Sequence, residues 1–408
     1  MRACLAGVAL AACASLPPPT AAAAAHRHAA DQDPPQSACT GTELDCAIAA
    51  TPFVDAAGRL WLAWTANGHV MLARSADGGA HFGAAIAVGD AGELLDTGAD
   101  ARPALVVTNA GRVVVAWGAF KDRQWNAQVW LASSDDDAHF STPRSLSADA
   151  TSQRFPALAL ADDGSILATW LDKRTVAANR QRGYRQSGAA LAVARSTDGG
   201  RSFGEERIVQ DRTCECCRLA LALDAGGRTV IALRTIYDDR ERDHALIVLD
   251  AAGRVQSDHR IAEDHWAIDA CPHHGPAVAI GAGQRIHVAW FTQGAARQGT
   301  FYARSLDDGA SFTAPMPVGH GDRMAGRPSL LARGPDVWLA WKEFDGKRST
   351  VWLRQSHDGG EHWSADRPVA AAEGYTDHPQ LVTLRGAAHL SWLTRARGYQ
   401  SLPLEDRR

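Results

Sequence analysis

The sequence lacks three patterns that would assign it to common functional classes. Its 42 Lys and Arg residues are mixed with 46 Asp and Glu residues and leave a net charge of −4, whereas a nucleic-acid-binding surface needs a strongly basic face. After residue 12 no apolar run is long enough to span a bilayer. No segment has the apolar periodicity of an amphipathic helix. We therefore expect no nucleic acid partner, no membrane-spanning helix and an all-β chain.

The first residues predict export. A short apolar stretch ends in Leu10-Ala11-Ala12-Cys13, which resembles a bacterial lipobox. We predict a signal peptide over residues 1–12 and lipidation of Cys13, so that the chain meets a membrane only through a lipid anchor. The alternative is cleavage after Ala25.

The residue after the lipobox and the following segment bear on location. Ala14, rather than Asp, is typical of lipoproteins sorted to the outer membrane, facing the periplasm or the cell surface. Cleavage after Ala25 would instead give a soluble periplasmic or secreted protein. Residues 13–38 are rich in Ala, Pro and His and predict a flexible tether.

A strand that ends in tryptophan recurs through the rest of the chain. Successive copies lie 51 to 64 residues apart, and one of the seven has Arg234 in place of the tryptophan; the others end in Trp64, Trp117, Trp170, Trp290, Trp341 and Trp392. A short strand such as 103–107 precedes each copy, and a third strand such as 129–132 follows it. A period near fifty is typical of propellers and repeat arrays.

An eight-residue motif of the form Ser-x-Asp-x-Gly-x-x-aromatic follows the third strand. The copies are 75–82, 196–203, 305–312 and 356–363, and 133–140 is a degenerate copy with Asp137 in place of the glycine. The Asp can accept backbone hydrogen bonds, the Gly permits a positive φ and the aromatic side chain fills the core. We therefore assign the motif a structural role. These motifs resemble the Asp-box (BNR) repeats of the sialidase-like superfamily over about residues 47–405.

The resemblance implies a single β-propeller of four-stranded blades over residues 39–408. Seven copies of the strand favour seven blades, whereas sialidases have six, so six is the alternative. The last unit, residues 378–404, has three strands, and we expect the segment around 39–49 to supply the fourth. Cys39 and Cys46 are expected to form a local disulfide, because an exported protein meets an oxidising compartment.

Alternating strand direction divides the connections between two faces. Face Y carries the first turn of each repeat and the Asp box. Face X carries the loop between the second and third strands and the link to the next repeat, and its variable loops are the expected place for function. The links contain Arg102, Arg154, Arg218, Arg327 and His378. These cations either pack across neighbouring repeats or form an anion-binding ring around the channel.

Catalytic residues are implied only by the resemblance. A sialidase uses three arginines around the substrate carboxylate and a tyrosine nucleophile activated by glutamate. The chain has five tyrosines, of which Tyr375, beside Glu373 and Asp377, is the candidate. Asp172 and Glu343 are further carboxylates on face X. The early Arg-Ile-Pro element has no clear match, so an exo-sialidase-like glycoside hydrolase is an alternative rather than the leading hypothesis.

Two links on face X hold the least common residues of the chain. One contains Cys214, Cys216 and Cys217; the link of the next repeat contains Cys271, His273 and His274. Either the cysteines form disulfides, or thiolates and imidazoles bind copper or zinc. The spacing matches neither a zinc ribbon nor a haem attachment motif. In an extended strand Cys217 would face away from Cys214 and Cys216, so a shared metal needs a bend.

The leading hypothesis is an exported propeller that acts as a binding or accessory module of the bacterial envelope. Its partner would be a glycan or an envelope protein, and its cofactor copper or zinc held by the Cys/His residues. A structural scaffold that recruits envelope partners is the third alternative.

Overall fold

The computed structural model describes residues 39–404, apart from positions 40, 185, 239 and 322. The predicted signal peptide, Cys13 and the tether lie outside the described residues. In the described part no helix is both long and apolar enough to cross a bilayer.

Nearly all regular elements are antiparallel strands, grouped into sheets in chain order. The first sheet contains β1 (Ala49–Val54), β2 (Leu60–Ala66), β3 (His69–Ser75) and β4 (Ile86–Asp90). The second contains β5 (Leu95–Asp96), β6 (Ala104–Val107), β7 (Val113–Phe120), β8 (Ala127–Ser134) and β9 (Arg144–Ser145).

An eight-stranded sheet follows, in which β13 and β15 join two successive meanders through one residue pair, Thr213 with Thr235. Its strands are β10 (Gln153–Leu160), β11 (Ile166–Asp172), β12 (Ala189–Ser196), β13 (Arg207–Thr213), β14 (Ala220–Leu223), β15 (Thr229–Tyr237), β16 (Glu241–Leu249) and β17 (Val255–Arg260).

Three further sheets complete the chain. The first has β18 (Ala277–Ile280), β19 (Ile286–Gln293), β20 (Gln298–Ser305) and β21 (Met316–Val318). The next has β22 (Gly326–Arg333), β23 (Asp336–Phe344), β24 (Arg348–Ser356) and β25 (Arg367–Glu373). The last has β26 (Gln380–Leu384), β27 (Ala387–Thr394) and β28 (Gly398–Pro403).

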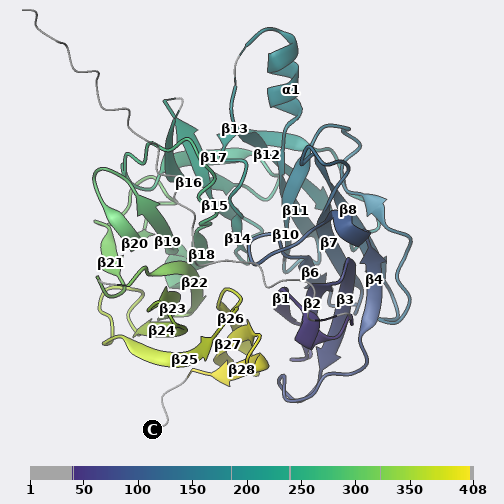
Figure 1. Cartoon of the computed structure of the whole chain (residues 1–408). Helices are drawn as coiled ribbons and strands as arrows, with labels where there is room; N and C mark the ends of the chain where they lie inside the picture. The colour runs from purple at the N-terminus through teal and green to yellow at the C-terminus, as the bar shows by residue number, and fades with distance from the viewer. Residues whose placement is uncertain (1–38, 40, 185, 239, 322, 405–408) are drawn as a thin grey trace, which may run out of the picture. The chain divides into compact units, whose positions relative to one another are not determined.

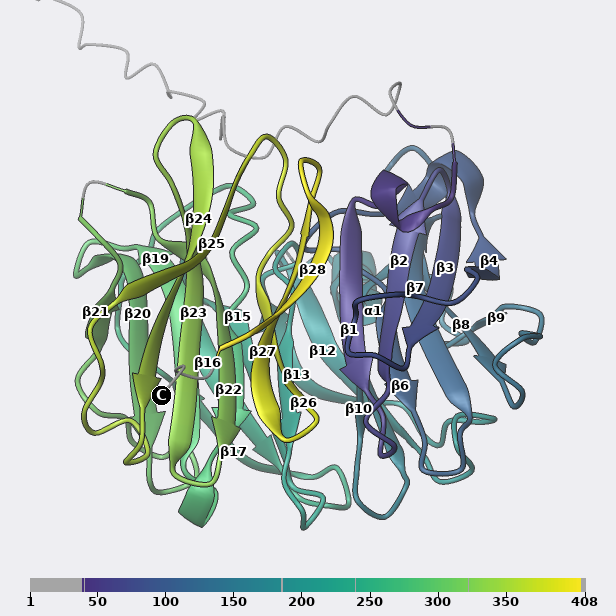
Figure 2. The same cartoon turned by 90° about the horizontal axis from the view of Figure 1, so that it is seen from below.

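The sheets are arranged as a β-propeller. Each first strand contacts the next in the order β1, β6, β10, β14, β18, β22 and β26, and β26 contacts β1. Figure 1 shows these strands around the centre of the view, with the later strands of each sheet outside them. In Figure 2 the β23–β24 and β27–β28 turns lie at the upper edge and the β26–β27 turn at the lower edge, so the upper edge is face X.

The recurring tryptophans form the layers between neighbouring sheets. All six are at most 1 % exposed, and Arg234, at the equivalent position of β15, is also 1 % exposed. Several of their indole nitrogens donate to buried acceptors, for example Trp170 to Asp172 Oδ2 at 3.0 Å and Trp341 to Glu343 Oε1 at 2.8 Å. The repeated strand is therefore the apolar centre of each unit, as its spacing predicted.

The Asp boxes are turns held by their own side chains. In the box after β12, Ser196 Oγ donates to Asp198 Oδ1 at 2.8 Å, and the backbone N–H of Ser202 donates to the same oxygen at 2.9 Å. Gly200 adopts φ 84°, and a Cβ there would lie 2.7 Å from Val114 Cγ2. Glycine is thus required by both backbone and packing.

The degenerate box differs from the expected register. Ser134 and Asp136, rather than Ser133 and Asp135, form the side-chain hydrogen bond, at 3.0 Å. The backbone N–H of His139 donates to Asp136 Oδ1 at 2.8 Å. The motif is shifted by one residue and its turn is shorter. The reason is that Asp137, which has a side chain, occupies the position of the glycine in the regular motif.

Within the described residues 39–404, the first and last sheets of the propeller meet without a shared strand. The segment expected to form a fourth strand beside β28 contains instead a 3-10 turn, η2 (Leu44–Cys46), closed by the Cys39–Cys46 disulfide. A loop that returns on itself within seven residues cannot also run extended along a strand. Closure comes from side chains: Asp377 Oδ2 accepts the backbone N–H of Ala50 at 3.1 Å, and Gln380 Nε2 donates to Ala50 O at 2.7 Å.

One α-helix was not expected from the sequence. It is α1 (Arg174–Gln181), in the connection between β11 and β12, and Val176 is its only buried residue. A helix with one apolar contact has no periodic pattern to detect. Two further 3-10 turns, η3 (Gly92–Leu94) and η4 (Ala282–Gln284), lie between strands.

The Asp boxes predict acid sensitivity. Hydrogen bonds from Ser202 lower the pKa of Asp198 below its usual 3.8, so its stabilising effect is present above about pH 4 and is lost as the pH falls. We expect the thermal midpoint to fall below about pH 4, and Asp198→Asn to lower it at pH 7 while flattening this acid dependence. Glu205→Gln, which removes an exposed carboxylate nearby, is the control. Equal pH profiles for Asp198→Asn and wild type would contradict the assignment.

Candidate metal centre

The cations predicted to ring the channel are paired with carboxylates. Arg102 pairs with Asp377 at 2.6 Å and Arg154 with Asp96 at 2.8 Å. Asp100 lies 3.0 Å from Arg327 Nη1, 3.5 Å from Arg218 Nε and 3.7 Å from His378 Nδ1. A channel cavity of about 360 Å³ is lined by Asp100, Arg102, Arg218 and His378, among others.

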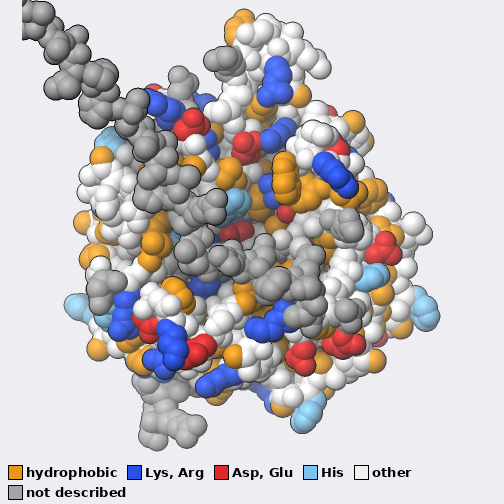
Figure 3. All heavy atoms as spheres, in the orientation of Figure 1, with side chains coloured by type: hydrophobic (Ala, Val, Ile, Leu, Met, Phe, Trp, Pro, Cys, Tyr) orange, Lys and Arg blue, Asp and Glu red, His pale blue; other side chains and the backbone are white. Residues whose placement is uncertain are grey.

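Among the described residues, Asp96, Asp100 and Asp377 offset most of the positive charge of these four arginines. Burial lowers the pKa of Arg218 to about 10 and that of His378 well below its usual value. In the orientation of Figure 1, Figure 3 shows Lys and Arg side chains interspersed with Asp and Glu side chains on this side of the molecule. An anion entering the channel would have to compete with these carboxylates.

Each predicted catalytic residue has interaction partners of its own in the structure. Tyr375 donates from its hydroxyl to Ile48 O at 2.8 Å. Glu373 is exposed and pairs with Lys347 at 3.1 Å. Asp172 and Glu343 are buried and accept from the tryptophans of their own strands.

Asp172 and Glu343 also have partners that orient them. Asp172 pairs with Arg174 at 2.8 Å and Glu343 lies 3.0 Å from His320 Nδ1. Asp377 is 1 % exposed and bonded to Arg102 and Ala50. These contacts explain the carboxylates as parts of the framework, and a hydrolase site built on them remains a prediction.

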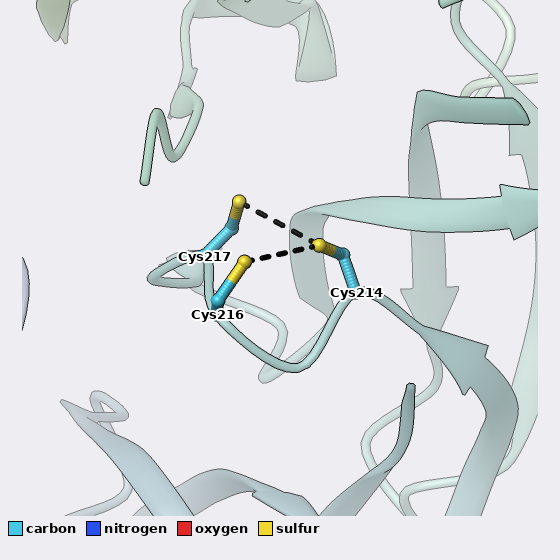
Figure 4. Close-up of side chains that lie close together, drawn as sticks. All are labelled: Cys214, Cys216 and Cys217. Atoms are coloured by element: carbon cyan, nitrogen blue, oxygen red, sulfur yellow. Dashed lines mark hydrogen bonds between the residues drawn. The ribbon is translucent and has the colours of Figure 1, made fainter. Parts of the chain in front are cut away.

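The thiols of Cys214, Cys216 and Cys217 converge in the link between β13 and β14. Their sulfur atoms all lie within 4.8 Å of one another, with 3.4 Å between Cys214 and Cys216 and 3.9 Å between Cys214 and Cys217. Figure 4 shows the three side chains pointing toward one point. Metal–sulfur bonds of about 2.3 Å place sulfurs about 3.8–4.0 Å apart in tetrahedral or trigonal sites, so the three thiols fit one metal ion.

The convergence requires the bend that an extended strand would not supply. Strand β13 ends at Thr213, and residues 215–217 form a turn before β14 begins at Ala220. The backbone N–H of Cys214 donates to Arg234 O at 2.8 Å, which holds the start of the turn against β15. The link is therefore bent, which is the condition that the sequence set for all three thiols to face one point.

The second link brings Cys271 to the same place. The neighbouring Cys216 thiol lowers the pKa of Cys271, and unlike the other three cysteines Cys271 is exposed. His274 stacks on Phe291 with ring centroids 4.0 Å apart, and the carbonyl of His273 accepts a hydrogen bond from Arg327. The cysteines thus gather, whereas the two histidines are held in packing and backbone contacts around them.

Arg242 and Arg234 complete the environment of the thiols. Arg242 Nη1 lies 3.2 Å from Cys214 Sγ. Hydrogen bonds from Cys216 and Cys217, followed by the charge of Arg242, lower the pKa of Cys214, while hydrogen bonding to Cys214 raises the pKa of Cys216. Arg242 therefore favours the thiolate form of Cys214 over its thiol form.

Sequence reasoning missed the role of these arginines. Arg242 and Asp243 belong to a strongly charged stretch over 238–243, yet Arg242 is 8 % exposed and Asp243 is fully buried. Strand β16 begins at Glu241 and carries both residues into the sheet. The available signal was Arg234, the one repeat position where a cation replaces tryptophan.

Comparisons with known proteins identify the fold. No protein-family model matches the sequence, and no curated protein sequence does. An ulvan lyase of polysaccharide lyase family PL25, solved bound to -[GlcA(1-4)Rha3S]-, is 12% identical, with 90% of this chain and 92% of that chain covered and a TM-score of 0.58. A protein of unknown function from Dyadobacter fermentans is 17% identical, with 76% and 95% covered and a TM-score of 0.52. At these identities the likeness shows a shared fold alone.

Asp377 provides a test of the structural explanation. Asp377→Asn leaves Arg102 without its charged partner in a buried position, so we expect a loss of about 3 kcal/mol in the free energy of unfolding, measured with urea. Glu373→Gln, which breaks an exposed pair four residues away, should change it by less than about 0.5 kcal/mol. A fully stable Asp377→Asn protein would reopen the catalytic interpretation of this carboxylate.

Proposed function

We propose that the protein is a metal-binding propeller whose Cys214, Cys216 and Cys217 thiolates hold a soft metal ion, copper or zinc. The observation that carries the proposal is the convergence of three buried sulfurs within 4.8 Å. Thiolate is the ligand that selects Cu(I) and that builds structural zinc sites. Cys271, a free cysteine of the neighbouring link, is exposed and in this proposal receives the ion first.

The fold in this proposal is a seven-bladed sialidase-like propeller. The contact ring from β1 through β26 supports seven blades, one of them with three strands. The Ser–Asp hydrogen bonds of the four regular boxes support the sialidase-like resemblance. The protein would act as a binding or accessory module rather than as a hydrolase.

The cysteine chemistry supports export to an envelope compartment, with Cys13 as the proposed lipid anchor. Cys39 and Cys46 are joined, whereas Cys214, Cys216, Cys217 and Cys271 are free. In a compartment that oxidises one pair, adjacent thiols would also be oxidised unless something occupies them. A bound metal ion would keep them as thiolates, while pairing within the cluster is the disulfide alternative.

The metal site can be tested on protein purified from the bacterial envelope without reducing agent. We expect native mass spectrometry to find one soft metal ion per chain that is lost on denaturation, together with four free thiols. Cys216→Ser and Cys217→Ser should each abolish the bound metal, whereas Cys39→Ser combined with Cys46→Ser should retain it. Disulfides among the four cysteines with no metal would overturn the proposal.

A second candidate function, glycan binding on face X, is favoured by Trp125. This side chain is 70 % exposed and its backbone is held at φ 64° in the loop between β7 and β8. Asp122 Oδ1 accepts the backbone N–H groups of Gln124 and Asn126 at 2.9 and 3.1 Å, and the indole packs edge-on against Phe120 at 5.0 Å. A large ring fixed in a strained, exposed position is a surface on which a sugar ring can stack.

Affinity electrophoresis in gels that contain polysaccharides tests this second candidate. We expect Trp125→Ala to weaken retention about 3- to 10-fold, the scale of one aromatic contact. Leu306→Ala, which removes an exposed apolar side chain from an Asp box on face Y, is the matched control. Equal retention of wild type and Trp125→Ala across neutral and acidic polysaccharides would count against glycan binding at this loop.

A further inference from the structure

Arg234 carries a buried positive charge whose partners are neutral. Its guanidinium donates to the carbonyl oxygens of Arg242 at 2.7 Å, Phe291 at 2.9 Å and His274 at 3.2 Å. It also lies 4.4 Å from the ring centroid of Trp266. Carbonyls and an aromatic face stabilise a cation without neutralising it.

Arg242 is in a similar position. Its closest polar partner is the sulfur of Cys214, at 3.2 Å. In the part of the chain that the structure describes, neither Arg234 nor Arg242 forms an ion pair with a carboxylate. This contrasts with Arg102 and Arg154, which have carboxylate partners of their own.

Among the described residues, the nearby carboxylates already pair with other cations. Asp100 pairs with Arg218 and Arg327, and Glu215, next to Cys214 in the chain, pairs with Lys173. Glu241 and Asp243 both pair with Arg260. Uncompensated buried cations are costly, so the thiol cluster is the group that can balance them. The more negative the bound complex, the better it matches this environment.

The charge of the complex depends on the metal. Three thiolates with a monovalent ion carry a net charge of −2, and with a divalent ion −1, whereas Arg234 and Arg242 together contribute +2. We propose that these two arginines make the three-thiolate site selective for Cu(I) over Zn(II). This inference rests on the proposed function, because it assumes that the cluster binds a metal.

Cys271 offers the one competing arrangement. Four thiolates around Zn(II) would also carry −2, but Cys271 is exposed and lies outside the group of sulfurs that are within 4.8 Å of one another. A three-thiolate site for a monovalent ion therefore needs only the buried cysteines. The two arrangements differ in whether Cys271 is required for tight binding.

The experiment compares Cu(I) and Zn(II) affinities of the full-length protein under anaerobic conditions, by competition with a chromophoric chelator for each ion. Arg242→Met should weaken Cu(I) binding about 10- to 100-fold, the size of one hydrogen bond to a charged group, with a smaller effect on Zn(II). Arg242→Lys should retain most of the Cu(I) affinity. Arg254→Met, which removes an exposed cation from the β16–β17 turn, should change neither.

The outcomes separate the two proposals. Cys271→Ser should leave Cu(I) affinity within about threefold of wild type, and thermal unfolding of each variant checks that it is folded. Equal weakening of both metals in Arg242→Met, tighter binding of Zn(II) by the wild type, or loss of binding in Cys271→Ser would overturn the selectivity while the metal site stands. A wild-type protein that binds neither ion would overturn the metal site itself.

Discussion

The buried guanidinium of Arg234 is the interaction on which the thiol site depends. It occupies the position where six other repeats place tryptophan, and it binds three carbonyl oxygens from β16, β19 and the link that holds Cys271. Its own carbonyl receives the backbone N–H of Cys214. One side chain and its peptide group therefore hold together the segments that bring the cysteines into contact.

The replacement of tryptophan by arginine has a clear physical consequence. Tryptophan fills the layer between sheets with an apolar surface and needs one acceptor for its indole nitrogen, as Trp341 shows with Glu343. Arginine at the same place needs several acceptors and introduces a charge. In the fourth repeat, backbone carbonyls supply the hydrogen-bond acceptors. The thiols on its face X are positioned to supply the compensating negative charge.

The other face X cations illustrate a different solution. Arg102 and Asp377 are both largely buried, and they join the first and last repeats through Ala50. Since β26 and β1 share no hydrogen-bonded strand among the described residues, this polar contact carries part of the closure that a shared strand provides in other propellers. Asp377, a catalytic candidate in the sequence, therefore has a role in the framework of the structure.

The sequence alone determined the repeat, the strand order and the turns of the four regular Ser-x-Asp-x-Gly motifs, because these depend on contacts within about fifty residues and on local backbone preferences. It also indicated the Cys39–Cys46 disulfide and the proximity of the two cysteine links. The turn at 215–217, the pairing of the arginines with Asp96, Asp100 and Asp377, and the burial of Arg242 were decided only by the tertiary structure. The arginine–aspartate pairs join residues from different repeats. Whether a charged side chain is structural or free for a ligand depends on which charges the fold places beside it. A sequence lists the charges, but only the closed fold determines which of them are left for a ligand to balance.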